Sequence, residues 1–263
     1  MGTRAVGGGW VRRTRRGTVG AAAVAIVALS GGCVTNAGSF TATMRPGSFL
    51  EALDGGGAPI PQSHIELGTA ACGNGVDDDL DGATDATDGQ CDATGDNNER
   101  LDGVQAFVAP TLPFQVASDG HFTVQPTGLV AQPVERCVPA AGGAVWCLAI
   151  TVKGAGGERQ GSINGTRVRL PLPVTLKFDA VTGFPGLDPL CESDYINGPY
   201  AGDGYDEATG NVTEQSAHET WLALTNCGPY NNTLNTLLGL PTESQSTLQW
   251  TLRNANGESI HQG

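Results

Sequence analysis

The amino-acid sequence predicts a mainly β protein: a β-sandwich-like domain preceded by an acidic, disulfide-bracketed segment. Glycine and proline account for 39 and 15 of the 263 residues, and they separate short runs of apolar and β-branched residues. Asn164-Gly165 lies between two such runs and is the strongest hairpin signal in the chain. Near the C-terminus, Leu248, Trp250 and Leu252 alternate with polar residues, as in a half-buried strand.

Composition divides the chain into four regions: residues 1–32, 33–71, 72–103 and 104–263. The last region carries most of the strand-like runs and a short helical pattern over 233–238, and we expect it to form the β-sandwich-like domain. Residues 33–71 are rich in Gly, Ser, Thr and Pro, which is typical of a stalk or linker. Residues 39–43 alternate well enough to form a strand, so both alternatives stay open there.

The first region has the organisation of a secretory signal peptide. Five arginines and no acidic residue precede Val19–Leu29, an apolar run of 11 residues, and small residues follow up to Cys33. The run is too short for a spanning helix, which needs about 20 residues. Small residues directly before a cysteine resemble the lipobox of bacterial lipoproteins, although Leu29 lies four residues before Cys33 rather than three. This resemblance implies lipidation of Cys33 and anchoring at the outer face of a membrane; the alternative is ordinary cleavage and secretion.

The cysteine count agrees with export. Seven cysteines are present, so acylation of Cys33 leaves six for three disulfides outside the reducing cytosol. Sequence allows 15 pairings. The most local one brackets a plausible hairpin or loop each time: Cys72 with Cys91, Cys137 with Cys147, and Cys191 with Cys227.

Charge excludes some classes of partner. All 27 acidic residues follow residue 32, together with only nine of the 14 basic residues. Nucleic acids and anionic lipid surfaces both require basic patches, so we expect neither as a partner. An acidic exported surface instead attracts cations.

The region 72–103 contains the one motif with specific chemistry. Carboxylates stand at positions 1, 3, 5, 9 and 12 of a twelve-residue loop, residues 77–88, with Gly82 at the sixth place. Calcium takes six to eight hard oxygen ligands, and glycine permits the sharp turn around the ion. The predicted calcium ligands are Asp77, Asp79, Asp81, the carbonyl of Ala83, Asp85 and Asp88.

This spacing resembles the calcium loops of EF-hands, dockerins and, most closely, thrombospondin type 3 repeats. The loop departs from an EF-hand because position 12 is Asp88 rather than Glu and no amphipathic helices flank it. Asp92, Asp96, Asn98 and Asp102 continue the acidic run and would supply a second site. The alternative is a solvated, disordered run of charges.

No catalytic motif stands out. The four histidines form no metal-binding pair, and the chain has no G-x-S-x-G elbow or P-loop. The loop 191–227 carries Asp203, Asp206 and Glu207, which suggest an extracellular carbohydrate-active hydrolase as an alternative function.

Short stretches over 108–124, 161–170 and 237–241 resemble a group of secreted actinobacterial proteins of uncharacterised function. The resemblance implies an exported β-sandwich-like domain and no catalytic residue. We therefore expect a calcium-binding surface module that contacts extracellular protein, glycan or envelope polymer.

Overall fold

The computed structural model describes residues 33–52, 64–75, 83–88, 91, 96–97, 106–194, 196 and 201–263. The chain divides into two units, Met1–Ser30 and Gly31–Gly263, and every described residue belongs to the second. The predicted signal peptide therefore lies outside the described residues. Within the described part, no helix is both long and apolar enough to cross a membrane.

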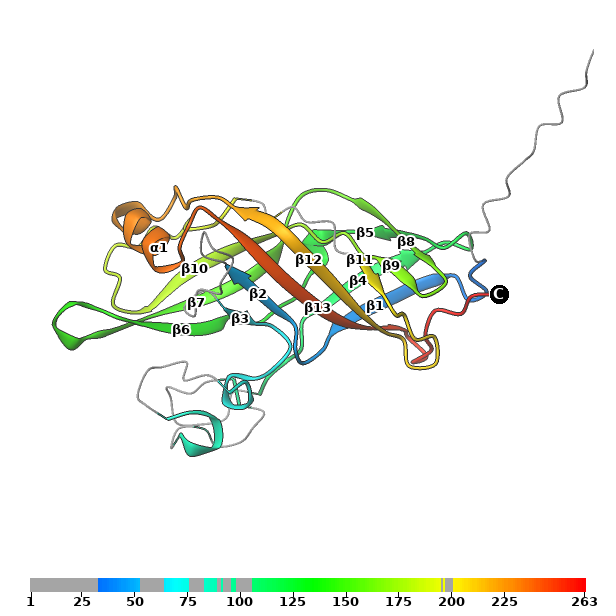
Figure 1. The fold of residues 1–263 in the computed structure, drawn as a ribbon, viewed down its shortest axis with the longest axis horizontal. Helices are drawn as coiled ribbons and strands as arrows, with labels where there is room; N and C mark the ends of the chain where they lie inside the picture. The colour runs from blue at the N-terminus through cyan, green and yellow to red at the C-terminus, as the bar shows by residue number, and fades with distance from the viewer. Residues whose placement is uncertain are drawn as a thin grey trace, which may run out of the picture. The chain divides into compact units, whose positions relative to one another are not determined.

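The larger of two antiparallel sheets closes on itself (Figure 1). Eight of its described strands form a ring. The ring closes because β1 (Gly38–Met44) also pairs with β13 (Thr242–Asn254), the eighth strand in the order given below. Two more strands, β2 (Phe49–Ala52) and β3 (Ile65–Glu66), continue the sheet from β13. In sheet order the strands are β1 (Gly38–Met44), β4 (Thr111–Val116), β5 (His121–Val124), β8 (Arg159–Asn164), β9 (Arg167–Arg169), β11 (Ala201–Asp203), β12 (Asn211–Trp221), β13 (Thr242–Asn254), β2 (Phe49–Ala52) and β3 (Ile65–Glu66).

The long strand β13 closes the ring. Its C-terminal half pairs with β1, from Trp250 opposite Met44 to Asn254 opposite Phe40, and its N-terminal half pairs with β2. On its other side β13 pairs with β12 along most of its length. The predicted alternation is confirmed, since Leu248, Trp250 and Leu252 are at most 2% exposed.

The smaller sheet consists of β10 (Val174–Thr182), β7 (Val145–Gly154) and β6 (Val134–Pro139), in that order. The helix α1 (Asn231–Leu237) places Leu234 against Ile150 and Phe178 of this sheet. The buried side chains of both sheets belong to one apolar cluster. Short 3-10 turns connect the strands: η2 (Ala71–Gly73), η3 (Asp85–Thr87), η4 (Pro126–Gly128), η5 (Ala141–Gly143) and η6 (Gly228–Tyr230).

The two ends of the described unit lie together. The backbone N–H of Gly263 donates to the carbonyl of Cys33 at 2.8 Å, and that of Thr35 donates to the carbonyl of His261 at 2.9 Å. The hydroxyl of Tyr205 donates to the carbonyl of Ile260 at 2.9 Å and accepts from its N–H at 2.8 Å. Burial raises the pKa of Tyr205 to about 12, so this hydroxyl stays protonated and holds the C-terminal segment against the sheet.

The structure confirms a mainly β protein with two antiparallel sheets around a common core. The alternative left open for residues 39–43 is decided in favour of a strand, since β1 pairs with both β4 and β13. Residues 49–52, which were expected in the stalk, form β2 of the main sheet. The predicted hairpin also slips by one residue: Asn164 pairs with Arg167, so Gly165 and Thr166 form the turn, with Gly165 at a φ of 59°. Glycine at the first central position suits a two-residue hairpin turn.

Candidate calcium-binding segment and neighbouring polar clusters

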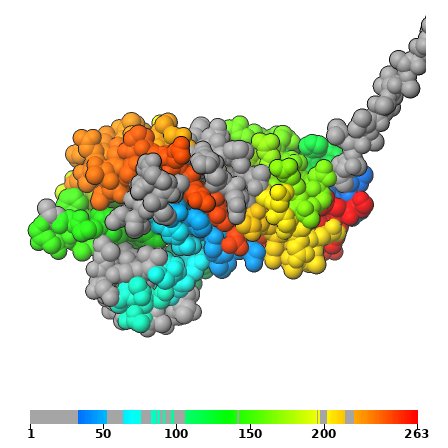
Figure 2. Space-filling view, in the orientation of Figure 1, coloured from blue at the N-terminus to red at the C-terminus, as the bar shows by residue number. Residues whose placement is uncertain are grey.

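The acidic segment, residues 72–103, leaves the main sheet directly after β3. The backbone N–H of Leu67 donates to the carbonyl of Ser48 at 2.8 Å. Gly68 then passes so close to the Arg45 carbonyl that a side chain there would collide with it. Beyond this point Cys72 is fully buried and joined to Cys91, with 5.6 Å between their Cα atoms. Figure 2 shows β3 and the residues after it in cyan, next to the blue residues of β2, and later described residues of the segment in teal.

All three disulfides have the predicted local pairing: Cys72–Cys91, Cys137–Cys147 and Cys191–Cys227. Cys33 is the one free cysteine of the described chain, and it is exposed. It immediately precedes Val34, whose N–H donates to the carbonyl of Ser118 at 2.8 Å. The residue that the sequence predicts to be lipidated is therefore followed directly by a residue bonded to the turn after β4.

Of the predicted calcium ligands, Ala83, Asp85 and Asp88 lie in the described part of the chain, whereas Asp77, Asp79 and Asp81 lie outside it. An Oδ2 atom of Asp85 accepts from the backbone N–H of Gly75 at 2.9 Å. This hydrogen bond joins Gly75, two residues before the predicted loop, to the ninth position of the loop. It lies within the stretch that the Cys72–Cys91 disulfide brackets.

The turn η3 sets the position of the last two carboxylates. Thr84 and Thr87 form a reciprocal capping box, in which the Thr84 N–H donates to the Thr87 hydroxyl at 3.0 Å. Asp85, at the first position of the turn, has a φ of 45°, a left-handed conformation that Asp tolerates better than most residues. Asp88 follows the turn and is only 4% exposed.

The buried residues Asp96 and Asn97 connect the acidic segment to the chain just before the smaller sheet. Asp96 is fully buried and Asn97 is 7% exposed. The carbonyl of Asp96 accepts from the Cys72 N–H at 3.0 Å, and the Asn97 amide donates to the carbonyl of Pro133 at 3.4 Å, just before β6. Of the residues suggested for a second ion, only Asp96 lies within the described chain.

The donor chemistry of the segment fits a hard divalent cation. Residues 72–103 contain ten acidic residues and a single basic one, Arg100. Among them, Asp88 and Asp96 are buried. Calcium would match such oxygen donors, with Asp85, Asp88 and the Ala83 carbonyl among its ligands.

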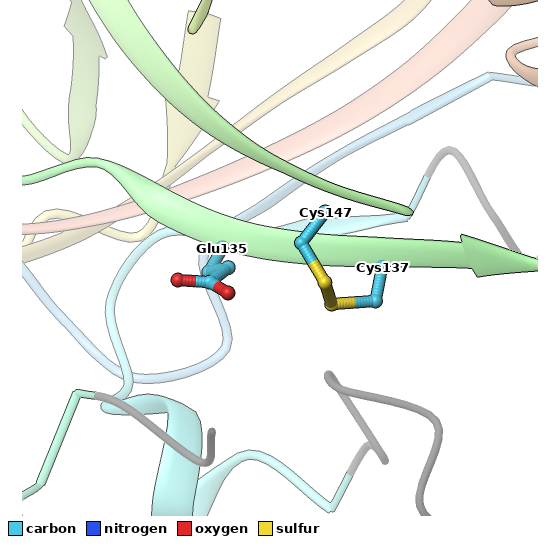
Figure 3. Close-up of side chains that lie close together, drawn as sticks. All are labelled: Glu135, Cys137 and Cys147. Atoms are coloured by element: carbon cyan, nitrogen blue, oxygen red, sulfur yellow. A yellow bond between two sulfur atoms is a disulfide. The ribbon is translucent and has the colours of Figure 1, made fainter. Parts of the chain in front are cut away.

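One other cluster has the composition of a metal site. Glu135, Cys137 and Cys147 place their ligand atoms within 4.8 Å of one another, all on one face of the β6–β7 pair (Figure 3). Both sulfurs are joined in a disulfide here, so they offer no thiolate. Glu135 and Cys137 are two residues apart and share a face of β6, and the register of β6 with β7 brings Cys147 opposite Cys137.

The carboxylates suggested for a hydrolase have partners of their own. The Asp203 side chain is 81% exposed and lies 3.8 Å from Arg167. Hydrogen bonds from the Thr209 hydroxyl and the Ala208 N–H lower the pKa of Asp206, whereas a general acid needs a raised one. Glu207 contacts the imidazole of His261 at 3.0 Å, in the segment that fixes the C-terminus.

A polar cluster that sequence reasoning missed lies on β2 and β3. His64 Nδ1 lies 3.1 Å from Glu51 Oε1, and Nε2 lies 3.0 Å from Glu66 Oε1. All three side chains are at most 26% exposed, and Phe49 packs on the imidazole with ring centroids 4.9 Å apart. Polar His64 and Glu66 alternate with apolar Ile65, which is typical of a strand. The signal was missed because the composition of residues 33–71 indicates a stalk or linker.

The charge state of His64 follows from this geometry. A neutral imidazole has one N–H and cannot donate to two carboxylates at once. The protonated ring can, and the hydrogen bond to Glu66, reinforced by that to Glu51, raises the pKa of His64 despite its partial burial. His64 therefore stabilises the β2–β3 pair as a cation.

Comparisons with protein-family models, with curated proteins and with solved structures yield no match for this chain. Its function must therefore be argued from its own residues.

We predict that the fold loses stability as the pH rises through the raised pKa of His64. The contribution of His64 is complete below the pKa of the unfolded chain, about 6.5. Above the folded pKa it is gone. A His64→Gln variant should unfold with a flatter pH dependence between pH 5 and 8, the difference being roughly 1.5 kcal/mol, the lower end for a hydrogen bond to a charged group.

Urea unfolding at a series of pH values measures this effect. The matched control is His121→Gln, because the His121 side chain is 63% exposed and pairs only with the equally exposed Asp119. An unchanged pH profile in His64→Gln, or an equal change in both variants, would contradict the assignment.

Proposed function

We propose that this chain is an exported, lipid-anchored surface protein whose closed sheet displays a calcium-binding segment. The observation that carries the proposal is the acidic loop itself: carboxylates at calcium-ligand spacing, bracketed by Cys72–Cys91, with the Gly75–Asp85 hydrogen bond inside the bracket and Asp88 buried. A disordered run of charges would have neither the Gly75–Asp85 hydrogen bond nor a buried carboxylate at Asp88.

Calcium would act here as a counter-charge for folding. The carboxylates of residues 77–88 repel one another, and an ion between them converts that repulsion into attraction. Cys72–Cys91 reduces the conformations available before the ion binds, so less entropy is lost on binding. The calcium-loaded segment would then present a fixed acidic surface to an extracellular protein, glycan or envelope polymer.

The lipid anchor rests on three observations. The N-terminal region has the organisation of a signal peptide, Cys33 directly follows its small residues, and this cysteine is exposed and outside the three disulfides. An acyl chain on Cys33 would therefore disturb no packing. The acidic balance of the remaining chain is compatible with a protein held at a surface by lipid rather than by basic residues.

We predict saturable calcium binding to the demetallated, oxidised protein with a dissociation constant of about a millimolar or below, the range of extracellular calcium modules. At a hundredfold excess over that constant, calcium should raise the free energy of unfolding by about 2.7 kcal/mol. Isothermal titration calorimetry and thermal unfolding measure the two quantities. An Asp77→Asn/Asp81→Asn variant should lose both effects.

The control for this titration removes the same charge elsewhere. Asp119 and Asp203 have side chains that are 67% and 81% exposed, so Asp119→Asn/Asp203→Asn lowers the acidic charge equally without touching the segment. Equal loss in the two double variants would indicate unspecific attraction to an acidic protein. Absence of binding heat in the unaltered protein would refute the calcium site.

For the anchor, we predict that the protein made in a lipoprotein-processing bacterium incorporates an alkyne-labelled fatty acid and sediments with membranes. Cys33→Ser should abolish both, while leaving the melting temperature of the purified protein unchanged because Cys33 is exposed and unbridged. Mass spectrometry of the mature N-terminus identifies the modified residue. An unlabelled protein cleaved elsewhere would contradict lipidation and leave the calcium proposal standing.

A further inference from the structure

The cluster of Glu135, Cys137 and Cys147 is arranged like the ligands of a soft-metal site. Cys137 and Cys147 are directly opposed in the β6–β7 ladder, with their Cα atoms 4.0 Å apart. Glu135 precedes Cys137 by two residues and so projects from the same face of β6. Figure 3 shows its carboxylate beside the disulfide, and the three ligand atoms lie within 4.8 Å of one another.

The disulfide contributes little to the connectivity of the fold. It joins residues 10 apart in sequence, against 19 and 36 for the other two bridges, so it restricts the unfolded chain least. The strands that it links are already paired from Val134 opposite Ile150 to Pro139 opposite Val145. After its reduction the ladder still holds the two cysteines face to face.

We propose that reduction of Cys137–Cys147 by a dithiol opens a zinc site made of the two cysteine thiolates and the Glu135 carboxylate. Thiol–disulfide exchange transfers two electrons and two protons from the dithiol, which becomes a disulfide, to the two cysteine sulfurs. Zinc then binds both sulfurs and releases their two protons. The fourth position of the ion is filled by water.

The geometry suits zinc. At a Zn–S distance of about 2.3 Å, two thiolates on a tetrahedral ion lie about 3.8 Å apart, and a carboxylate oxygen lies slightly closer to each. All these separations fall below the 4.8 Å span of the cluster. Cys137 and Cys147 are 8% and 2% exposed, so a cation would compensate two thiolates that are poorly solvated. Calcium, which prefers hard oxygen ligands, would not compete here.

The test uses the chain with Cys33→Ser, so that no thiol is free before reduction. The protein is reduced with dithiothreitol, separated from it without oxygen, and titrated with Co²⁺, whose thiolate complexes absorb in the near ultraviolet. We expect a thiolate–cobalt band at one ion per chain, and its loss when Zn²⁺ displaces cobalt. The same treatment of Cys137→Ser/Cys147→Ser should give no such band. This control shows whether thiols from the reduced Cys72–Cys91 and Cys191–Cys227 bridges bind cobalt.

Glu135→Gln tests the third ligand. It keeps both thiols and the size of the side chain, and it should weaken cobalt binding by about tenfold or more because one anionic ligand is lost. Three results would overturn the proposal: a band no stronger than in the double serine variant, equal affinity in Glu135→Gln, or loss of the far-ultraviolet β signal on reduction before metal is added. None of these depends on calcium binding by the acidic segment.

Discussion

The pairing of β13 with three other strands is the constraint on which the rest of the structure depends. Its contact with β1 closes the main sheet, which leaves no open edge along either strand and encloses Trp250 and Phe40. The same strand holds β2, from which β3 and the acidic segment follow. Cys33 lies five residues before β1, and its carbonyl accepts from the N–H of Gly263. The proposed anchor point therefore closely precedes a strand that pairs with β13, and the acidic segment follows β3, which β2 joins to β13.

The acidic segment differs physically from the sheets that carry it. It has few apolar residues to bury, so its order must come from covalent closure, from hydrogen bonds to the sheets and from counter-charge. The structure provides the first two, through Cys72–Cys91, the Leu67–Ser48 hydrogen bond and the contact of Asn97 with Pro133. Calcium would provide the third. On β6, Arg136 and Val138 line an apolar pocket, whereas Glu135 and Cys137 alternate with them and lie on the opposite face of the strand.

Patterns among neighbouring residues predicted much of this fold. Features that depend on pairing between distant segments could not be predicted from the sequence. The alternation around Trp250 is visible within a few residues, and the structure confirms it. The cysteines form the most local of the possible pairings, with partners 10, 19 and 36 residues apart. The role of residues 38–44 was not visible, because their partners lie at 111–116 and 250–254 and only strand pairing brings these together. The cluster around His64 escaped for the same reason, since Glu51 comes from a different strand. The calcium ligands stay a prediction: their spacing is visible in the sequence, but Asp77, Asp79 and Asp81 lie outside the described residues.

Hydrogen–deuterium exchange of the oxidised protein, measured by mass spectrometry with and without calcium, tests the central claim most directly. A sheet closed by β13 should be stable by itself, and calcium should order only the segment attached to it. Peptides from residues 71–103 should gain protection with calcium, while those covering β1 and the second half of β13 should be strongly protected in both states. Protection that rises across β1 and β13 and not in residues 71–103 would contradict this claim, because calcium would then stabilise the sheet rather than the segment.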